Sequence, residues 1–157
     1  MSFVFLLYKV SVDTSAFLLE WQHFRVLVEK KMISRRKWLE EHAKDNYVKQ
    51  AHKEGFVARA AYKLLEIEEK DHILAKAKVV VDLGAAPGSW LQVCRKIMGP
   101  KALLFGIDLL ELQIDIPNVH FIQGDFRDEA VQQQMHDILE QCEVDLILSD
   151  IAQNMSG

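Results

Sequence analysis

The hydrophobic pattern of the chain changes near residue 78, from helix-like spacing to short, continuous apolar runs. Such runs, bounded by glycine or polar residues, are typical of strands that are buried on both faces. They predict strands at residues 78–83, 103–107, 119–122 and 144–148. Helical patterns lie between them, at residues 89–98 and 129–141. Strands that alternate with helices predict an α/β fold, a parallel sheet with helices on both faces.

A helical pattern also precedes the first of these strands. A polar, helix-permissive segment covers residues 38–49 and is interrupted at Gly55, and a second helix is predicted over about 58–70. Apolar residues at helical intervals would form the buried stripe of this second helix: Phe56, Ala60, Leu64 and Ile67. Lys63 lies beside that stripe, at the edge of the apolar face.

Residues 1–33 are treated as an N-terminal extension of unclear role, and residues 34–157 as the main domain. Apolar residues recur in the extension at intervals that would suit an amphipathic helix: Phe17, Leu18, Trp21, Phe24 and Val28. The apolar run at residues 3–8 is short, and neither a basic segment nor a convincing cleavage site flanks it. A secretory signal is therefore not predicted.

Composition is ordinary for one globular domain, because 50% of the 157 residues are hydrophobic and 27% are charged. Cys94 and Cys142 form neither a CxxC pair nor a zinc pattern, and the six histidines are scattered, so no metal site is predicted. No apolar stretch approaches the ~20 residues that cross a bilayer. We expect a soluble, cytoplasmic protein without a membrane partner, and we favour a monomer.

Charge is distributed unevenly along the chain. The formal net charge is −4, yet residues 25–63 contain eleven Lys and Arg against five Asp and Glu. A basic segment joined to an acidic body is typical of a protein that meets a polyanion such as RNA. Charge alone favours a solvated helix face, so the segment becomes informative only together with motifs.

A glycine-rich turn follows the first predicted strand, within the string Val81-Asp82-Leu83-Gly84-Ala85-Ala86-Pro87-Gly88-Ser89-Trp90. Glycine lets the backbone approach a ligand where a Cβ would collide, and the following helix presents free N–H groups. The GxxxG spacing differs from the GxGxxG of dinucleotide sites, and the Gly-Lys-Ser/Thr of a P-loop is missing. A glycine-rich turn can also be simple chain geometry, so the whole string carries the signal.

Three successive predicted strands end in, or just before, an aspartate: Asp108, Asp125 and Asp150. A carboxylate after a strand can accept hydrogen bonds from ribose hydroxyls, which suits Asp108, or from an adenine amino group, which suits Asp125. Any one of them alone would more often be a turn former or a helix cap. Three together, beside a glycine turn, favour a nucleoside cofactor, and an acidic rim also suits a positively charged sulfonium.

These motifs resemble those of the FtsJ-like methyltransferases, and most closely the bacterial branch that methylates a uridine ribose in large-subunit (23S) ribosomal RNA. The resemblance runs from about Ser34 to Gly157. It is carried by Asp82–Trp90, by Gln123-Gly124-Asp125-Phe126-Arg127-Asp128, by Ser149-Asp150 with Asn154-Met155-Ser156-Gly157, and by Ala60-Ala61-Tyr62-Lys63-Leu64.

The resemblance implies a seven-strand Rossmann-like fold that binds S-adenosylmethionine and acts on ribosomal RNA or the large ribosomal subunit. It implies cofactor contacts from five residues: Gly88, Trp90, Asp108, Asp125 and Asp150. The family uses a Lys-Asp-Lys-Glu set for methyl transfer, of which Lys63 matches the first lysine and Asp150 the aspartate. Without the resemblance, Lys63 would be interpreted as a solvated helix lysine.

Chemistry assigns different roles to the two matched residues. The 2'-oxygen must attack the methyl carbon in line with the departing sulfur, so positioning supplies much of the acceleration. A free lysine is protonated at neutral pH and is a poor base. We therefore assign Lys63 to orienting the hydroxyl and stabilising negative charge, and Asp150 to holding the lysines in place. The second lysine of the family set is the better proton acceptor.

The sequence departs from the family pattern in four respects. No counterpart of the second lysine or of the glutamate follows Asp150, so the fold is expected to be incomplete at the C-terminus, with an open sheet edge. Gln153 replaces a usual proline, and Val57-Ala58 replace a usual Arg-Ser ahead of Arg59. An alternative interpretation is therefore a catalytically incomplete fragment that binds cofactor or RNA without turnover. An NAD-dependent enzyme is disfavoured by the glycine spacing.

Overall fold

The computed structural model describes residues 5–10, 44–139 and 142–150. Its elements, in chain order, are β1 (Phe5–Val10), α3 (Lys44–Lys53), α4 (Ala60–Asp71), β2 (Val79–Leu83), α5 (Ser89–Met98), β3 (Leu103–Asp108), β4 (Val119–Gln123), α6 (Glu129–Leu139) and β5 (Val144–Ser149). The four predicted strands and the helices predicted over about 58–70, 89–98 and 129–141 are present, with described ends shifted by at most two residues. Of the helix-permissive segment 38–49, residues 44–49 lie in α3, and residues 38–43 lie outside the described residues. The helix suggested for the extension lies outside the described residues.

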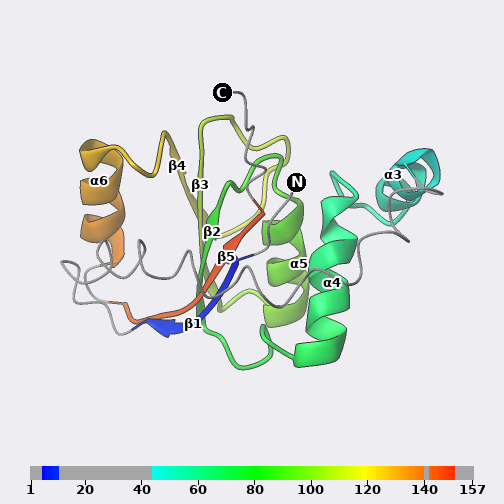
Figure 1. Cartoon of the computed structure of the whole chain (residues 1–157), viewed down its shortest axis with the longest axis horizontal. Coiled ribbons are helices and arrows are strands. Elements are labelled where there is room, and N and C mark those ends of the chain that lie inside the picture. Colours follow the sequence, from blue (N-terminus) through cyan, green and yellow to red (C-terminus); the bar gives the residue numbers. More distant parts are fainter. Residues whose placement is uncertain (1–4, 11–43, 140–141, 151–157) are drawn as a thin grey trace.

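The strands form one sheet in the order β1-β5-β2-β3-β4 (Figure 1). β2 pairs in parallel with both β3 and β5, and β3 pairs in parallel with β4. The predicted parallel sheet is therefore confirmed for four strands. The fifth strand, β1, pairs antiparallel with β5 along the edge that was expected to be open. The expectation of an open edge was therefore wrong for the described residues. These residues contribute five strands, whereas the resemblance implied seven for the complete family fold.

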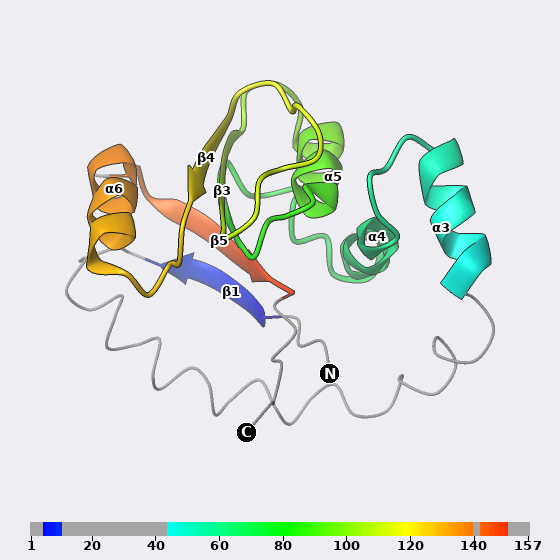
Figure 2. The same cartoon turned by 90° about the horizontal axis from the view of Figure 1, so that it is seen from above.

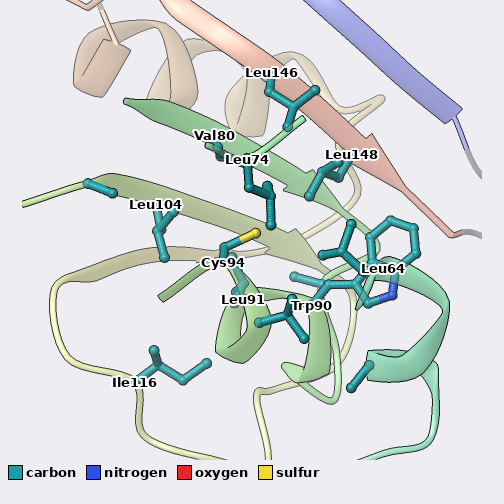
Figure 3. Close-up of a cluster of buried hydrophobic side chains, with 14 of the residues drawn as sticks. Leu64, Leu74, Val80, Trp90, Leu91, Cys94, Leu104, Ile116, Leu146 and Leu148 are labelled. Atoms are coloured by element: carbon teal, nitrogen blue, oxygen red, sulfur yellow. The ribbon is translucent and has the colours of Figure 1, made fainter. Parts of the chain in front are cut away.

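Helices cover both faces of the sheet, as predicted (Figures 1 and 2). α4 and α5 pack on one face, around a core that includes Leu64, Leu91 and Leu148 (Figure 3). α6 lies on the other face, where a second core includes Val81 and Ile147. Because successive strand residues point to opposite faces, each buried strand contributes to both cores. None of the helices in the described ranges combines the length and the apolar composition of a membrane span.

The buried stripe of α4 differs from the predicted one. Ala61, Leu64 and Glu68 are its buried residues, whereas Ala60 and Ile67 are only partly covered. The predicted stripe counted apolar residues only and therefore missed Glu68. The carboxylate of Glu68 accepts a hydrogen bond from the backbone N–H of Leu74 at 2.7 Å, which compensates for its removal from water.

Candidate functional site

The carboxyl ends of the parallel strands bring the glycine turn and Asp108 into direct contact. Asp108 ends β3, and its two carboxylate oxygens accept backbone hydrogen bonds from Ala86 and Leu110, each at 2.9 Å. The backbone N–H of Gly124, after β4, donates to the carbonyl of Asp108 at 2.8 Å. Each carboxylate oxygen has a second lone pair. Asp108 is thus held rigidly and can still accept from hydroxyl groups of a ligand.

Gly88 occupies a backbone conformation that other residues rarely adopt, with φ at 111°. A Cβ at this position would come within 3.0 Å of Ile114 Cγ2, so the surrounding loop also leaves little room for a side chain. α5 begins directly after Gly88, at Ser89. The turn therefore places the N–H groups of the first turn of α5, which have no partners within the helix, at the carboxyl ends of the strands, the expected ligand edge of the sheet.

The side chain of Trp90 belongs to the core rather than to an open surface (Figure 3). Only 3% of the residue is exposed, and its indole Nε1 donates a hydrogen bond to the carbonyl of Ala60 at 2.8 Å. This bond ties α5 to the first residue of α4. A cofactor contact from Trp90 would therefore have to come from its main chain.

Asp125 follows β4 and pairs with a neighbour in the chain. Its carboxylate forms an ion pair with the exposed guanidinium of Arg127 and also accepts the backbone N–H of Arg127 at 2.9 Å. The hydrogen bonds from Arg127 lower the pKa of Asp125 to about 2. Asp125 is thus an ionised acceptor at the ligand edge. An adenine amino group would have to share this carboxylate with Arg127.

Lys63 and Asp150 are 87 residues apart in sequence and form an ion pair across the fold. Lys63 Nζ, on α4, lies 2.5 Å from Asp150 Oδ1, directly after β5. Burial raises the pKa of Asp150, and the hydrogen bond and charge of Lys63 oppose this shift. The side chains remain 31% and 20% exposed, respectively, so both can still be reached from solvent.

Asp82 is a fourth carboxylate at this edge, and the sequence interpretation gave it no role. It is 1% exposed, and its Oδ2 has no hydrogen-bond partner. Burial raises the pKa of Asp82 to about 8, and the charges of Asp150 and Asp108 add to the shift. A charged residue inside the apolar run Val79–Leu83 was the signal that could have identified it.

Strand register explains why three of the carboxylates face the same side of the sheet. Asp82 pairs with Gly106 on β3 and with Leu148 on β5. Asp108 and Asp150 are each two residues beyond these partners, so all three side chains point to the face covered by α4 and α5. Lys63 reaches the group from α4.

Two further features were not predicted. Leu109 and Leu110 follow Asp108 and are 63% and 69% exposed, which places apolar surface beside the carboxylate that was predicted to accept from ribose hydroxyls. The loop before α4 contains Val57-Ala58, where the family usually has Arg-Ser. The N–H of Val57 donates to Gln92 Oε1 at 2.8 Å, and Gln92 Nε2 donates to the carbonyl of Gly55 at 2.9 Å. These bonds fix the loop before α4 to α5. The departure at residue 153 lies outside the described residues.

A hollow of about 440 Å³ lies beside this edge, and it is lined by the 111–116 loop and by β4. None of the residues predicted to bind cofactor lines it. The candidate site therefore consists of the residues at the strand ends and their contacts, and not of this hollow. In the described part of the chain, no group of three or more His, Cys, Asp or Glu side chains is arranged to hold a metal ion.

The chain is similar in sequence to known proteins. The model of the FtsJ-like methyltransferase family matches residues 56–157. Proteins named ribosomal RNA large subunit methyltransferase E are similar in sequence: that of Chromobacterium violaceum is 50% identical over 120 residues, and that of Acinetobacter baumannii is 49% identical over 133 residues. These alignments cover 76% and 85% of this chain, but only 58% and 61% of the relatives.

A solved structure shares the arrangement of elements. It is the crystal structure of a Plasmodium falciparum protein that carries the provisional name of a ribosomal RNA methyltransferase. The TM-score is 0.54 at 37% sequence identity, and the match covers 64% of this chain and 58% of that one. The chain thus spans about three fifths of the length of the curated relatives it matches.

Proposed function

This chain belongs to the FtsJ-like methyltransferase family, and from this premise we propose that it binds S-adenosylmethionine and methylates the ribose 2'-hydroxyl of a uridine in large-subunit (23S) ribosomal RNA. One observation carries the proposal. Asp108 is hydrogen-bonded to the glycine turn, and the Lys63–Asp150 pair lies on the same face at the same edge. That juxtaposition offers a nucleoside site and a hydroxyl-orienting cation side by side.

The residues present suit the chemistry of an adenosyl sulfonium. Asp108 would accept from the ribose hydroxyls, Asp125 would accept from the adenine amino group, and Leu109 would offer apolar surface to the ring. Gly88 would let the backbone approach the ligand closely. Asp82 has a buried oxygen without a hydrogen-bond partner, and Asp150 lies nearby, so the local electrostatics favour a cation. When bound, the cofactor supplies the methyl group and a neutral thioether leaving group.

Lys63 and Asp150 are the proposed catalytic residues of the chain. The ion pair fixes Lys63 Nζ, which has further N–H donors that can orient a 2'-hydroxyl and stabilise the charge that develops on its oxygen. Asp150 positions the lysine. Because the chain spans only part of its relatives, we assign the proton acceptor to none of the described residues.

The proposed partner is ribosomal RNA or the large ribosomal subunit, met by basic residues in a cytoplasmic setting. The candidates for phosphate contacts are Arg35, Arg36, Lys37 and Lys53. Lys53 lies in the last turn of α3, and the other three are outside the described residues. Charge reversal at these positions should weaken RNA binding and flatten its salt dependence while sparing cofactor binding. Unchanged RNA affinity, measured as a salt titration, would exclude this assignment.

Calorimetry with S-adenosylmethionine, together with a methyl-transfer assay on ribosomal particles, tests the function itself. Binding with turnover supports the enzyme. Binding without turnover supports the second candidate, a catalytically incomplete chain that binds cofactor or RNA. Preferential binding of NAD over S-adenosylmethionine would contradict both.

A further inference from the structure

β5 leads directly into Asp150, which pairs with Lys63, and residues 5–10 cover one edge of this strand. Its residues from Leu146 to Ser149 are buried, and it contributes to the cores on both faces of the sheet. β2 pairs with one edge of β5. Without a second partner, the other edge would present a row of free N–H and C=O groups beside an apolar strand, which is a template for association with other chains.

β1 pairs with this edge over the length of β5 (Figures 1 and 2). Val10 lies opposite Val144 at the start of β5, and Phe5 lies opposite Ser149 at its end. The pairing thus reaches the residue directly before Asp150. Because the strands are antiparallel, the N-terminal end of β1 lies at the ligand edge of the sheet.

We propose that residues 5–10 act as a built-in edge strand that closes the sheet at β5 and keeps Ser149 and Asp150 in place. In this role β1 is a positioning element, because its pairing with β5 fixes the strand from which Asp150 meets Lys63. The occupant of the β5 edge is this segment of the same chain. The consequence for the Lys63–Asp150 pair rests on the proposed function, whereas the strand pairing does not.

Proline substitution in the full chain tests the pairing directly. Successive backbone N–H groups of a strand point to opposite sides, so either Leu6 or Leu7 directs its N–H toward β5. Leu6→Pro combined with Leu7→Pro therefore removes the inward donor whichever residue holds it. The matched control is Leu6→Val with Leu7→Val, which keeps both N–H groups and favours a strand.

Hydrogen exchange, resolved by residue along β5, gives a readout that global destabilisation would not. One alternate set of β5 amides faces β1 and the other faces β2. In the proline variant the set that faces β1 should lose at least about 10-fold in protection, while the set that faces β2 keeps its protection. The valine control should match the unmodified chain. Equal protection of both sets in the proline variant and the unmodified chain would overturn the proposal.

Two further measurements separate this proposal from the proposed function and from other occupants of the edge. The affinity of the unmodified chain for S-adenosylmethionine tests the proposed function. The chain can fail to bind the cofactor while the exchange pattern still supports the pairing of β1 with β5. Sedimentation of the proline variant should reveal concentration-dependent association through the bare edge. If the unmodified chain instead protects this edge of β5 only at concentrations where it dimerises, the occupant is a second copy and the proposal is wrong.

Discussion

Asp82 is the residue whose environment differs most from that of an ordinary aspartate. Burial raises its pKa to about 8, against about 3.9 in an unfolded chain. Between these values the folded state keeps a proton that the unfolded state has lost, so the contribution of Asp82 to stability falls as pH rises from ~4 to ~8. A cation that binds beside Asp82 would lower this raised pKa.

The first prediction concerns Asp82→Asn, which removes the titration and nearly preserves the shape. The free energy of unfolding of the unmodified chain should fall between pH 5 and pH 8. This fall should exceed that of the variant by more than about 1.4 kcal/mol, which corresponds to one pKa unit. Urea denaturation at the two pH values measures this difference. Parallel pH profiles for the two proteins would show that Asp82 does not titrate in this range.

The second prediction concerns Lys63→Met, which removes the cation from Asp150. Both side chains are partly exposed, so the variant should lose only ~1 kcal/mol of stability in thermal or urea unfolding. Methyl transfer should fall at least about 100-fold while cofactor affinity changes only a few-fold, because the lysine is proposed to act on the hydroxyl. Lys63→Arg, which can keep the ion pair, should retain stability. Unchanged methyl transfer in Lys63→Met would contradict the assigned role.

At the residue scale, sequence reasoning was most informative where a side chain lies at the end of a strand. Asp108 meets the glycine turn and Asp150 meets Lys63, although no spacing in the sequence links α4 to β5. It was less informative where tertiary packing decides the direction of a side chain. The indole of Trp90 is buried against α4, and Asp82 is hidden inside an apolar run.

Gly88 and Gly55 lie in turns beside α5 and α3, respectively. The third prediction compares Gly88→Ala with Gly55→Ala: both positions have positive φ, but only the Cβ at Gly88 would meet another atom within 4 Å. Each should lose about 1–2 kcal/mol of stability through the left-handed backbone. Only Gly88→Ala should also weaken S-adenosylmethionine binding, which calorimetry measures. Equal affinities for the two variants would place the ligand away from this turn.

At the element scale, periodic or continuous apolar patterns were sufficient to predict the helices and strands of the main domain. α5 has the predicted limits, and β2 to β5 lie where apolar runs stand between polar turns. β1 was not predicted, because Phe5–Val10 lacks an alternating pattern and its strand conformation depends on a partner more than 130 residues away. Glu68 shows the same limit for helices, since its burial depends on the backbone of Leu74.

At the scale of the whole molecule, the described residues form a four-stranded parallel sheet with one antiparallel edge strand, and four aspartates lie at the carboxyl ends of the parallel strands. The strand order brings together strand ends that are distant in sequence, because β2 lies between β3 and β5. Ligands in sheets of this kind gather outside the carboxyl ends of the strands. The alternation of strands and helices in the sequence predicted this edge, whereas the pairing of β1 with β5 required the three-dimensional structure.

The most direct test of the account is calorimetric titration of S-adenosylmethionine into the unmodified chain, into Asp108→Ala and into Asp71→Ala. Asp71 ends α4, is exposed and serves as the matched loss of one carboxylate. We predict binding to the unmodified chain and to Asp71→Ala, and at least a 10-fold loss of affinity for Asp108→Ala, equivalent to ~1.4 kcal/mol. Equal affinity of all three, with each protein folded, would contradict a cofactor site at the carboxyl ends of the strands.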